Sequence, residues 1–136
     1  MDRRDLVARF VAAALVLAGG IVHLRLWLDG YRDIPDSVIG PSFMANFIAS
    51  VVVAIALVLW RHWVVVVAAL ALVNGTLLGF ALSRTDRGIF DFTERGFDPS
   101  PEAVLALVFE IGAAIVLLWL LYRVLTDDDR ASFVVS

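Results

Sequence analysis

Cysteine and lysine are both absent from this chain of 136 residues, and charged residues make up only 18% of it. Without cysteine the chain can form no disulfide, no thiolate metal site and no iron–sulfur cluster. All 11 basic residues are arginine, the net charge is −3, and no basic block of the kind that binds nucleic acid occurs. The sequence therefore predicts no cysteine chemistry and no nucleic-acid partner.

Apolar residues are as abundant as charged ones are scarce. They make up 61% of the chain, against about half in an ordinary soluble protein. So large an apolar share leaves too little polar surface to cover a water-soluble core. We therefore expect the protein to lie in a membrane, with the lipid bilayer as its partner.

Four long apolar segments account for most of this share. Crossing the hydrocarbon of a bilayer takes about 20 apolar residues in helical form. Four runs reach that length: 6–28, 42–60, 63–83 and 102–122. Backbone groups in lipid must bond within their own segment, so these runs are expected to be helices. The predicted fold is an all-α membrane protein, a single domain over residues 1–136 built as a four-transmembrane-helix bundle, with a mobile cytoplasmic tail at 127–136.

Arginine placement predicts the orientation. Cytoplasmic segments of membrane proteins carry an excess of basic residues, and the first helix usually dominates. The N-terminus, the short 60–63 turn and the C-terminal tail hold Arg3, Arg4, Arg9, Arg61, Arg123 and Arg130. The two other loops hold Arg32, Arg84, Arg87 and Arg95. We therefore expect both termini in the cytoplasm and a multi-pass protein of the plasma membrane.

The first segment has one alternative reading. A basic start, an apolar stretch and small residues at 18–20 are also typical of a secretory signal peptide. Apolar residues continue to Leu28, however, and no clean A-x-A cleavage site is present. The full spanning length favours a first transmembrane helix over a cleaved leader.

Each apolar segment carries one polar residue that is costly to place in lipid. These residues are His23, Asn46, Asn74 and Glu110. At about 1.5 Å per helical residue, all four lie roughly 6 to 14 Å below the outer surface of the membrane. We therefore expect them to meet as one polar cluster in the outer half of the bilayer.

Small residues accompany this cluster. Gly20 stands three residues before His23, and Gly75 and Gly79 form a small-xxx-small ridge beside Asn74. Small side chains let neighbouring transmembrane helices approach closely. We predict that these three glycines are helix-packing residues.

The polar cluster has two readings. In the first it is structural, since Asn and His side chains bond across membrane helices and stabilise a bundle by roughly 0.6–2 kcal/mol each. In the second it binds a ligand or moves a proton, because ionisable residues inside a membrane are functional candidates by default. The asparagines favour the first reading, Glu110 favours the second, and His23 stands between them. A carboxyl in this setting is expected to be protonated or paired with His23.

The longer outer loop, 84–101, mixes charged residues with Ile89 and three phenylalanines. Loops of this length often fold over a site. Aromatic side chains also lie in the headgroup region of a membrane, and this second reading is favoured for Phe90, Phe92 and Phe97.

Strong catalytic and metal-binding patterns are missing. No H-E-x-x-H, G-x-S-x-G, Walker or dinucleotide motif occurs. His62 lies at the cytoplasmic turn, about 20 Å or more from His23, so the two cannot share a metal or a haem within one chain. Two copies of His23 across an oligomer stay open. We therefore predict no enzyme, no cofactor and no metal site.

Several residues around the first loop resemble a group of known proteins. They are the run 20–24, Trp27, Tyr31, and the runs 39–41 and 43–46. Together with the glutamate of the last span, Glu110, they are similar to small four-span integral membrane proteins of high-GC, actinobacterial-type bacteria. The resemblance implies four spans with His23, Asn46 and Glu110 in one constellation, and it carries no activity over.

Two functions are open for such a chain. The first is a non-enzymatic accessory or scaffolding component that partners other membrane proteins or a second copy of itself. Minimal loops, small-residue ridges and the missing catalytic motifs favour it. The second is a small proton-coupled transporter or a ligand- or lipid-binding sensor. In that case Glu110 and His23 take up a proton, or a cationic or lipidic ligand, from the outer leaflet.

Overall fold

The computed structural model describes residues 2–134. Four long helices run through them, with a short 3-10 turn, η1 (Tyr31–Asp33), in the first loop. The long helices are α1 (Arg3–Leu28), α2 (Ile39–Leu59), α3 (Trp63–Ser83) and α4 (Glu102–Val134). Within the described residues all four are long and apolar enough to cross a membrane, which confirms the predicted all-helical class.

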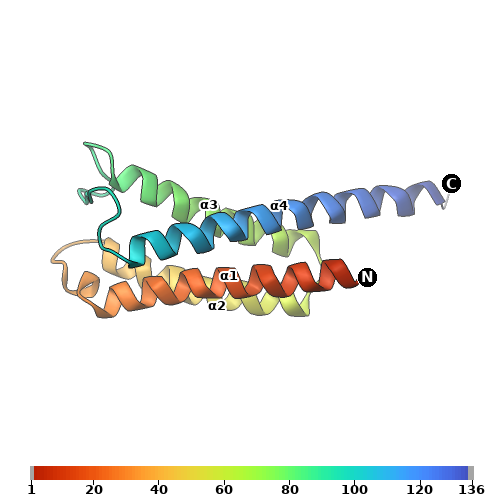
Figure 1. Cartoon of the computed structure of the whole chain (residues 1–136), viewed down its shortest axis with the longest axis horizontal. Coiled ribbons are helices and arrows are strands. Elements are labelled where there is room, and N and C mark those ends of the chain that lie inside the picture. Colours follow the sequence, from red (N-terminus) through yellow and green to blue (C-terminus); the bar gives the residue numbers. More distant parts are fainter. Residues whose placement is uncertain (1, 135–136) are drawn as a thin grey trace.

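The helices lie side by side, and their connections gather at two opposite ends (Figure 1). We call the end that carries the segments 29–38 and 84–101 the loop end. The other end carries the N-terminus and the tight turn between α2 and α3, and we call it the terminal end. α4 extends beyond the rest of the bundle on this side (Figure 1).

α2 begins earlier than its apolar run predicts, at Ile39 instead of residue 42. The Ser37 hydroxyl accepts a hydrogen bond from the Ile39 amide at 3.1 Å, which satisfies one of the amides that a helix start leaves free. Pro41 then lies in the first turn, where its missing N–H costs no helical hydrogen bond. The starts of α3 and α4 agree with the predicted ones.

α4 does not end near residue 122, where its apolar run ends, but continues to Val134. No glycine or proline stands in its second half to terminate it. Arg123 supports the extension, because its Nε lies 3.3 Å from an Asp5 carboxylate oxygen on α1. The predicted tail is therefore helical up to Val134, and residues 135 and 136 lie outside the described part of the chain.

The core is concentrated toward the terminal end. There all four helices contribute to one buried apolar cluster, which includes Val16, Leu57, Val66 and Leu117. A second, smaller cluster at the loop end draws its buried residues from α1 and α4 only. Of the pairs of long helices that pack together, α2 and α3 contact each other least. α3 therefore leaves the packed core as it approaches the loop end, and space is left beside it.

Candidate functional site

The space beside α3 is a cavity of about 550 Å³ at the loop end. All four long helices and the 84–101 segment contribute to its wall. Most of the lining residues are apolar, among them Leu26, Phe43, Leu72 and Ala106. The polar side chains of the helices that reach it include His23, Asn46, Thr76 and Glu110. An apolar cavity with a few convergent polar groups is the usual form of a small-molecule site.

The cavity is open on one side. Its lining residues on α1 and α4 are mostly buried, as His23 and Glu110 are. Several lining residues on the other two helices are exposed, among them Ala45 on α2, and Ala71 and Gly75 on α3. The opening therefore lies between α2 and α3, the pair of helices that packs least tightly.

Glu110 is the most isolated polar group in the cavity wall. Only 4% of the residue is exposed. Its carboxyl lies against Gly19 of α1, so closely that a Cβ atom added to Gly19 would be 2.6 Å from Oε1. No described side chain or amide donates a hydrogen bond to this carboxyl. A buried carboxyl without a protein partner is either protonated and neutral, or its negative charge is compensated by a bound group.

His23 is buried in the same wall, and one of its ring nitrogens already forms a hydrogen bond within the protein. Nδ1 lies 2.8 Å from the Gly19 carbonyl oxygen, and its ring meets that of Phe43 edge-on at 5.1 Å. Since a carbonyl oxygen can only accept, Nδ1 carries a proton. In the neutral ring Nε2 is then a free acceptor. The pairing of His23 with Glu110 that the sequence suggests is not formed between the described atoms; both residues contact Gly19 instead.

Asn46 joins α2 to α3. Its Nδ2 donates to Thr76 Oγ1 at 2.7 Å, and its Oδ1 accepts from the Ser50 hydroxyl at 3.3 Å. Both ends of the amide are therefore used within the protein, which agrees with the structural role favoured for the asparagines. Thr76 is a partner that sequence reasoning missed. A threonine in an apolar helix can bond the carbonyl four residues back, as Thr76 does with Leu72, and so it does not stand out as polar.

Asn74 does not belong to the cluster, contrary to the prediction. It is exposed, it does not line the cavity, and its Nδ2 donates to the Leu70 carbonyl of its own helix at 2.9 Å. The reason is geometric. Asn74 and Thr76 are two residues apart, which corresponds to about 200° around a helix, so only one of them can face the cavity.

Of the three glycines expected to pack helices together, one does so and two do not. Gly20 makes a close helix contact, since an added Cβ would lie 2.5 Å from Ser50 Cβ on α2. Gly75 and Gly79 do not, because a Cβ added to either would have no atom of the described chain within 4 Å. Both line the cavity instead. Within the described chain the small-residue ridge on α3 therefore borders the cavity and packs against no other helix.

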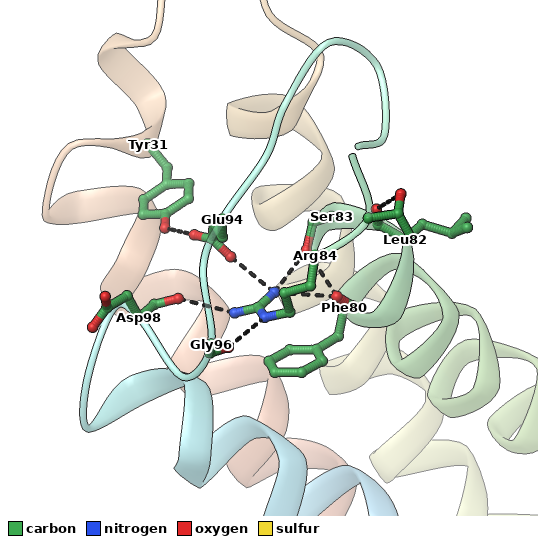
Figure 2. A network of polar contacts seen from close by, with 9 residues as sticks. Tyr31, Phe80, Leu82, Ser83, Arg84, Glu94, Gly96 and Asp98 are labelled. Atoms are coloured by element: carbon green, nitrogen blue, oxygen red, sulfur yellow. Dashed lines mark hydrogen bonds and ion pairs between the residues drawn. The ribbon is translucent and has the colours of Figure 1, made fainter. Parts of the chain in front are cut away.

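The 84–101 segment forms a roof over the loop end, and Arg84 holds it there (Figure 2). The Arg84 guanidinium pairs with Glu94 at 3.0 Å and donates to the carbonyls of Gly96 (2.8 Å) and Asp98 (2.9 Å). It also lies over the Phe80 ring, 3.4 Å from its centroid. Ile89, Phe90 and Phe92 line the cavity while Phe97 does not. Phe90 and Phe92 therefore border the site, and because Phe90 is also 69% exposed, the headgroup position favoured for these rings stays a prediction.

Tyr31 connects this roof to the first loop. Its hydroxyl donates to Glu94 (Figure 2). Its ring stacks on that of Phe43, with the ring centroids 4.7 Å apart. Burial raises the pKa of Tyr31, and the hydrogen bond to Glu94 and the negative charge of Glu94 raise it further. The two loops and α2 thus meet at one polar junction, which a single sequence cannot reveal because its members are far apart in the chain.

We expect the tyrosinate of Tyr31 to form only above pH 10, the ordinary pKa of tyrosine being about 10. The raised pKa means that the folded protein favours the neutral phenol, so its contribution to stability is complete below about pH 10 and is lost as the pH rises through the folded value. In a Tyr122→Phe variant Tyr31 is the sole tyrosine. Its absorbance titration near 295 nm should have a midpoint above 10, and a midpoint at or below 10 would show that the junction with Glu94 is not formed.

The terminal end carries a buried arginine that sequence reasoning counted only as a cytoplasmic charge. Arg9 is 3% exposed, and its Nη1 donates to the carbonyls of Trp60 (3.2 Å) and Leu57 (3.4 Å) at the end of α2. These are carbonyls that a helix end leaves free, at the negative end of its dipole. Beside Arg9 and Arg61 lies a second cavity of about 500 Å³. Arg9 therefore ties the start of α1 to the end of α2 at this end of the bundle.

Comparisons with protein-family models, with curated proteins and with solved structures find no match. The resemblance drawn from the residues of the first loop therefore stays a prediction. The function has to be inferred from the site itself, chiefly from the open cavity and from the unpaired carboxyl of Glu110.

Proposed function

We propose that this chain is a multi-pass protein of the plasma membrane that binds an apolar or amphipathic ligand in its loop-end cavity, without enzymatic chemistry. The observation that carries the proposal is the cavity itself, which is open between α2 and α3 and has the buried carboxyl of Glu110 in its wall. Its volume of about 550 Å³ falls within the roughly 300–1,000 Å³ of ordinary ligand sites.

The basic residues support an orientation with the cavity in the outer leaflet. Arg3, Arg4, Arg9 and Arg61 all lie at the terminal end, which the excess of positive charge assigns to the cytoplasm. The loop end then faces outward, and the opening between α2 and α3 faces the lipid of the outer leaflet. A ligand dissolved in that leaflet would reach the cavity without crossing water.

The competing function is an accessory or scaffolding component. It drew on the glycine ridge of α3 as a surface for a partner helix, and Gly75 and Gly79 face the cavity instead. This placement favours a ligand over a helix at the same position. Exposed apolar residues such as Ile48 and Leu78 remain available to lipid or to other membrane proteins.

A cavity-filling substitution tests the proposal. We expect Gly75→Phe to reduce the amount of lipid-like ligand that copurifies with the protein at least severalfold, because the new ring has no atom of the described chain within 4 Å of its Cβ and enters the cavity. Replacing glycine with phenylalanine also favours the helix, by about 0.5 kcal/mol, so the fold should be kept. Native mass spectrometry of the detergent-purified protein counts the bound ligand, and circular dichroism checks the fold.

The matched control is Leu78→Phe, which places the same ring on an exposed position of α3 that does not line the cavity. It should retain the ligand of the natural protein. Equal ligand content in the two variants, with both folded, would overturn the proposal. A natural protein that carries no ligand but copurifies with one protein in fixed ratio would favour the accessory role.

A further inference from the structure

The polar groups of the cavity wall divide into those already bonded and those still free. The hydrogen-bond donors each donate to an acceptor of the protein: the Asn46 amide, the Arg84 guanidinium and the hydroxyls of Ser42, Thr76 and Ser83. Among the carboxyl groups and ring nitrogens of the wall, two accept no hydrogen bond from any described residue. They are the carboxyl of Glu110 and Nε2 of His23. The unused capacity of the cavity is therefore a capacity to accept hydrogen bonds.

These two acceptors belong to lining residues that both contact Gly19. The Glu110 carboxyl lies against Gly19, and His23 Nδ1 lies 2.8 Å from the carbonyl oxygen of the same residue. Gly19 admits the carboxyl because it has no side chain, and its carbonyl holds the imidazole with Nε2 unused. A ligand group at this part of the cavity wall thus meets a carboxyl from α4 and a neutral ring nitrogen from α1.

We propose that the cavity selects an apolar amine, bound as its ammonium ion, whose N–H groups donate to Glu110 and to His23. This inference rests on the ligand-binding function proposed above and names the class of its ligand. The ammonium charge compensates a carboxylate that is costly when buried alone. Charge-assisted hydrogen bonds of this kind are the strong ones, and the apolar lining, including Leu26, Phe43 and Ala106, accommodates the rest of the molecule.

Other ligand groups match this wall less well. A carboxylate or phosphate ligand has only hydrogen-bond acceptors to offer to two groups that are themselves acceptors, and it brings no positive charge to compensate Glu110. An alcohol donates a single hydrogen bond and carries no charge. A quaternary ammonium ion carries the charge but has no N–H to donate. Selectivity among these groups therefore reports directly on the proposed chemistry.

Four probes with one apolar body provide the test: 1-adamantylamine, its N-trimethyl derivative, 1-adamantanol and 1-adamantanecarboxylate. Binding is measured calorimetrically on the full chain in phosphatidylcholine nanodiscs at neutral pH. Each isotherm is corrected with Gly75→Phe protein, which accounts for partitioning of the probe into lipid. We expect the amine to bind about ten- to hundredfold more tightly than the alcohol, with the trimethyl derivative weaker than the amine and the carboxylate weakest.

Glu110→Gln is expected to bring the amine and the alcohol to within a fewfold of each other. The control is Asn74→Leu, which also removes a polar group from a membrane-spanning helix, but at a position that does not line the cavity. This variant should keep the full preference for the amine over the alcohol. If Glu110→Gln does not fold, the order of the four probes on the natural protein decides the matter alone.

The outcomes separate the two proposals. Equal binding of amine and alcohol, or tightest binding of the carboxylate, would overturn the amine selectivity while leaving the ligand-binding function in place. If none of the probes binds above the Gly75→Phe background and no native ligand copurifies, the ligand-binding function fails together with the inference. A preference for the amine that survives in folded Glu110→Gln would show that Glu110 does not recognise it.

Discussion

Replacing Arg84 with glutamine is expected to release the 84–101 roof and to lower the free energy of unfolding by about 3 kcal/mol. The substitution leaves the largely buried Glu94 carboxylate without its cation and frees the carbonyls of Gly96 and Asp98. Glu94 also accepts from Tyr31, so the junction between the two loops should loosen with it. Titration with sodium dodecyl sulfate in mixed micelles measures the stability. Hydrogen exchange of residues 85–98 reports the release of the roof.

Arg95→Gln is the matched control for this prediction. It removes the same charge from the same segment at an exposed position, and it should change the stability by no more than about 0.5 kcal/mol. Amide exchange in the segment should stay as in the natural protein. Equal effects of the two substitutions would mean that net charge, and not the contacts of Arg84, governs the roof.

Alanine at Gly20 is expected to destabilise the bundle by about 1–3 kcal/mol, whereas alanine at Gly75 should be neutral or stabilising. At Gly20 the new methyl group would lie 2.5 Å from Ser50 Cβ and 2.9 Å from its Oγ, so α1 and α2 must move apart. At Gly75 the methyl group enters open space, and the helix gains from losing a glycine. The same detergent titration compares the two variants.

The two glycines carry the same substitution in similar apolar helices, so intrinsic helix preference cancels in the comparison. The sign of the difference therefore reports the space around each position. Destabilisation by Gly75→Ala equal to that by Gly20→Ala would indicate that α3 packs against a neighbour at the loop end. The cavity would then be closed, and the ligand-binding proposal would lose its main support.

The four helices could be predicted because length and apolarity are local properties. The apolar runs are each near the length that a bilayer crossing needs, and their starts for α3 and α4 agree with the structure to the residue. The predicted end of α4 was wrong for one local reason and one tertiary reason. The apolar run ends near residue 122, but no terminating residue follows it, and Arg123 finds partners on α1 that only the folded chain provides.

The candidate site was predictable to the same degree. His23, Asn46 and Glu110 stand out because a polar residue inside an apolar segment is costly in lipid, and all three line the cavity. Asn74 stands out equally and lies elsewhere. Its neighbour Thr76 faces the cavity without standing out at all, since its hydroxyl is satisfied within its own helix.

By itself, then, the sequence determined the number of helices, their approximate bounds and the three polar residues of the site, all of which follow from composition and spacing along one segment. The tertiary structure alone decided which face of α3 turns inward, where α3 leaves the core and how Arg84 holds the 84–101 segment over the loop end. These depend on how side chains from different helices fit together. Helical periodicity places residues relative to one another around an axis, but the rotation of that axis against its neighbours is set by packing. The cavity beside Gly75 and Gly79 is the consequence of that rotation.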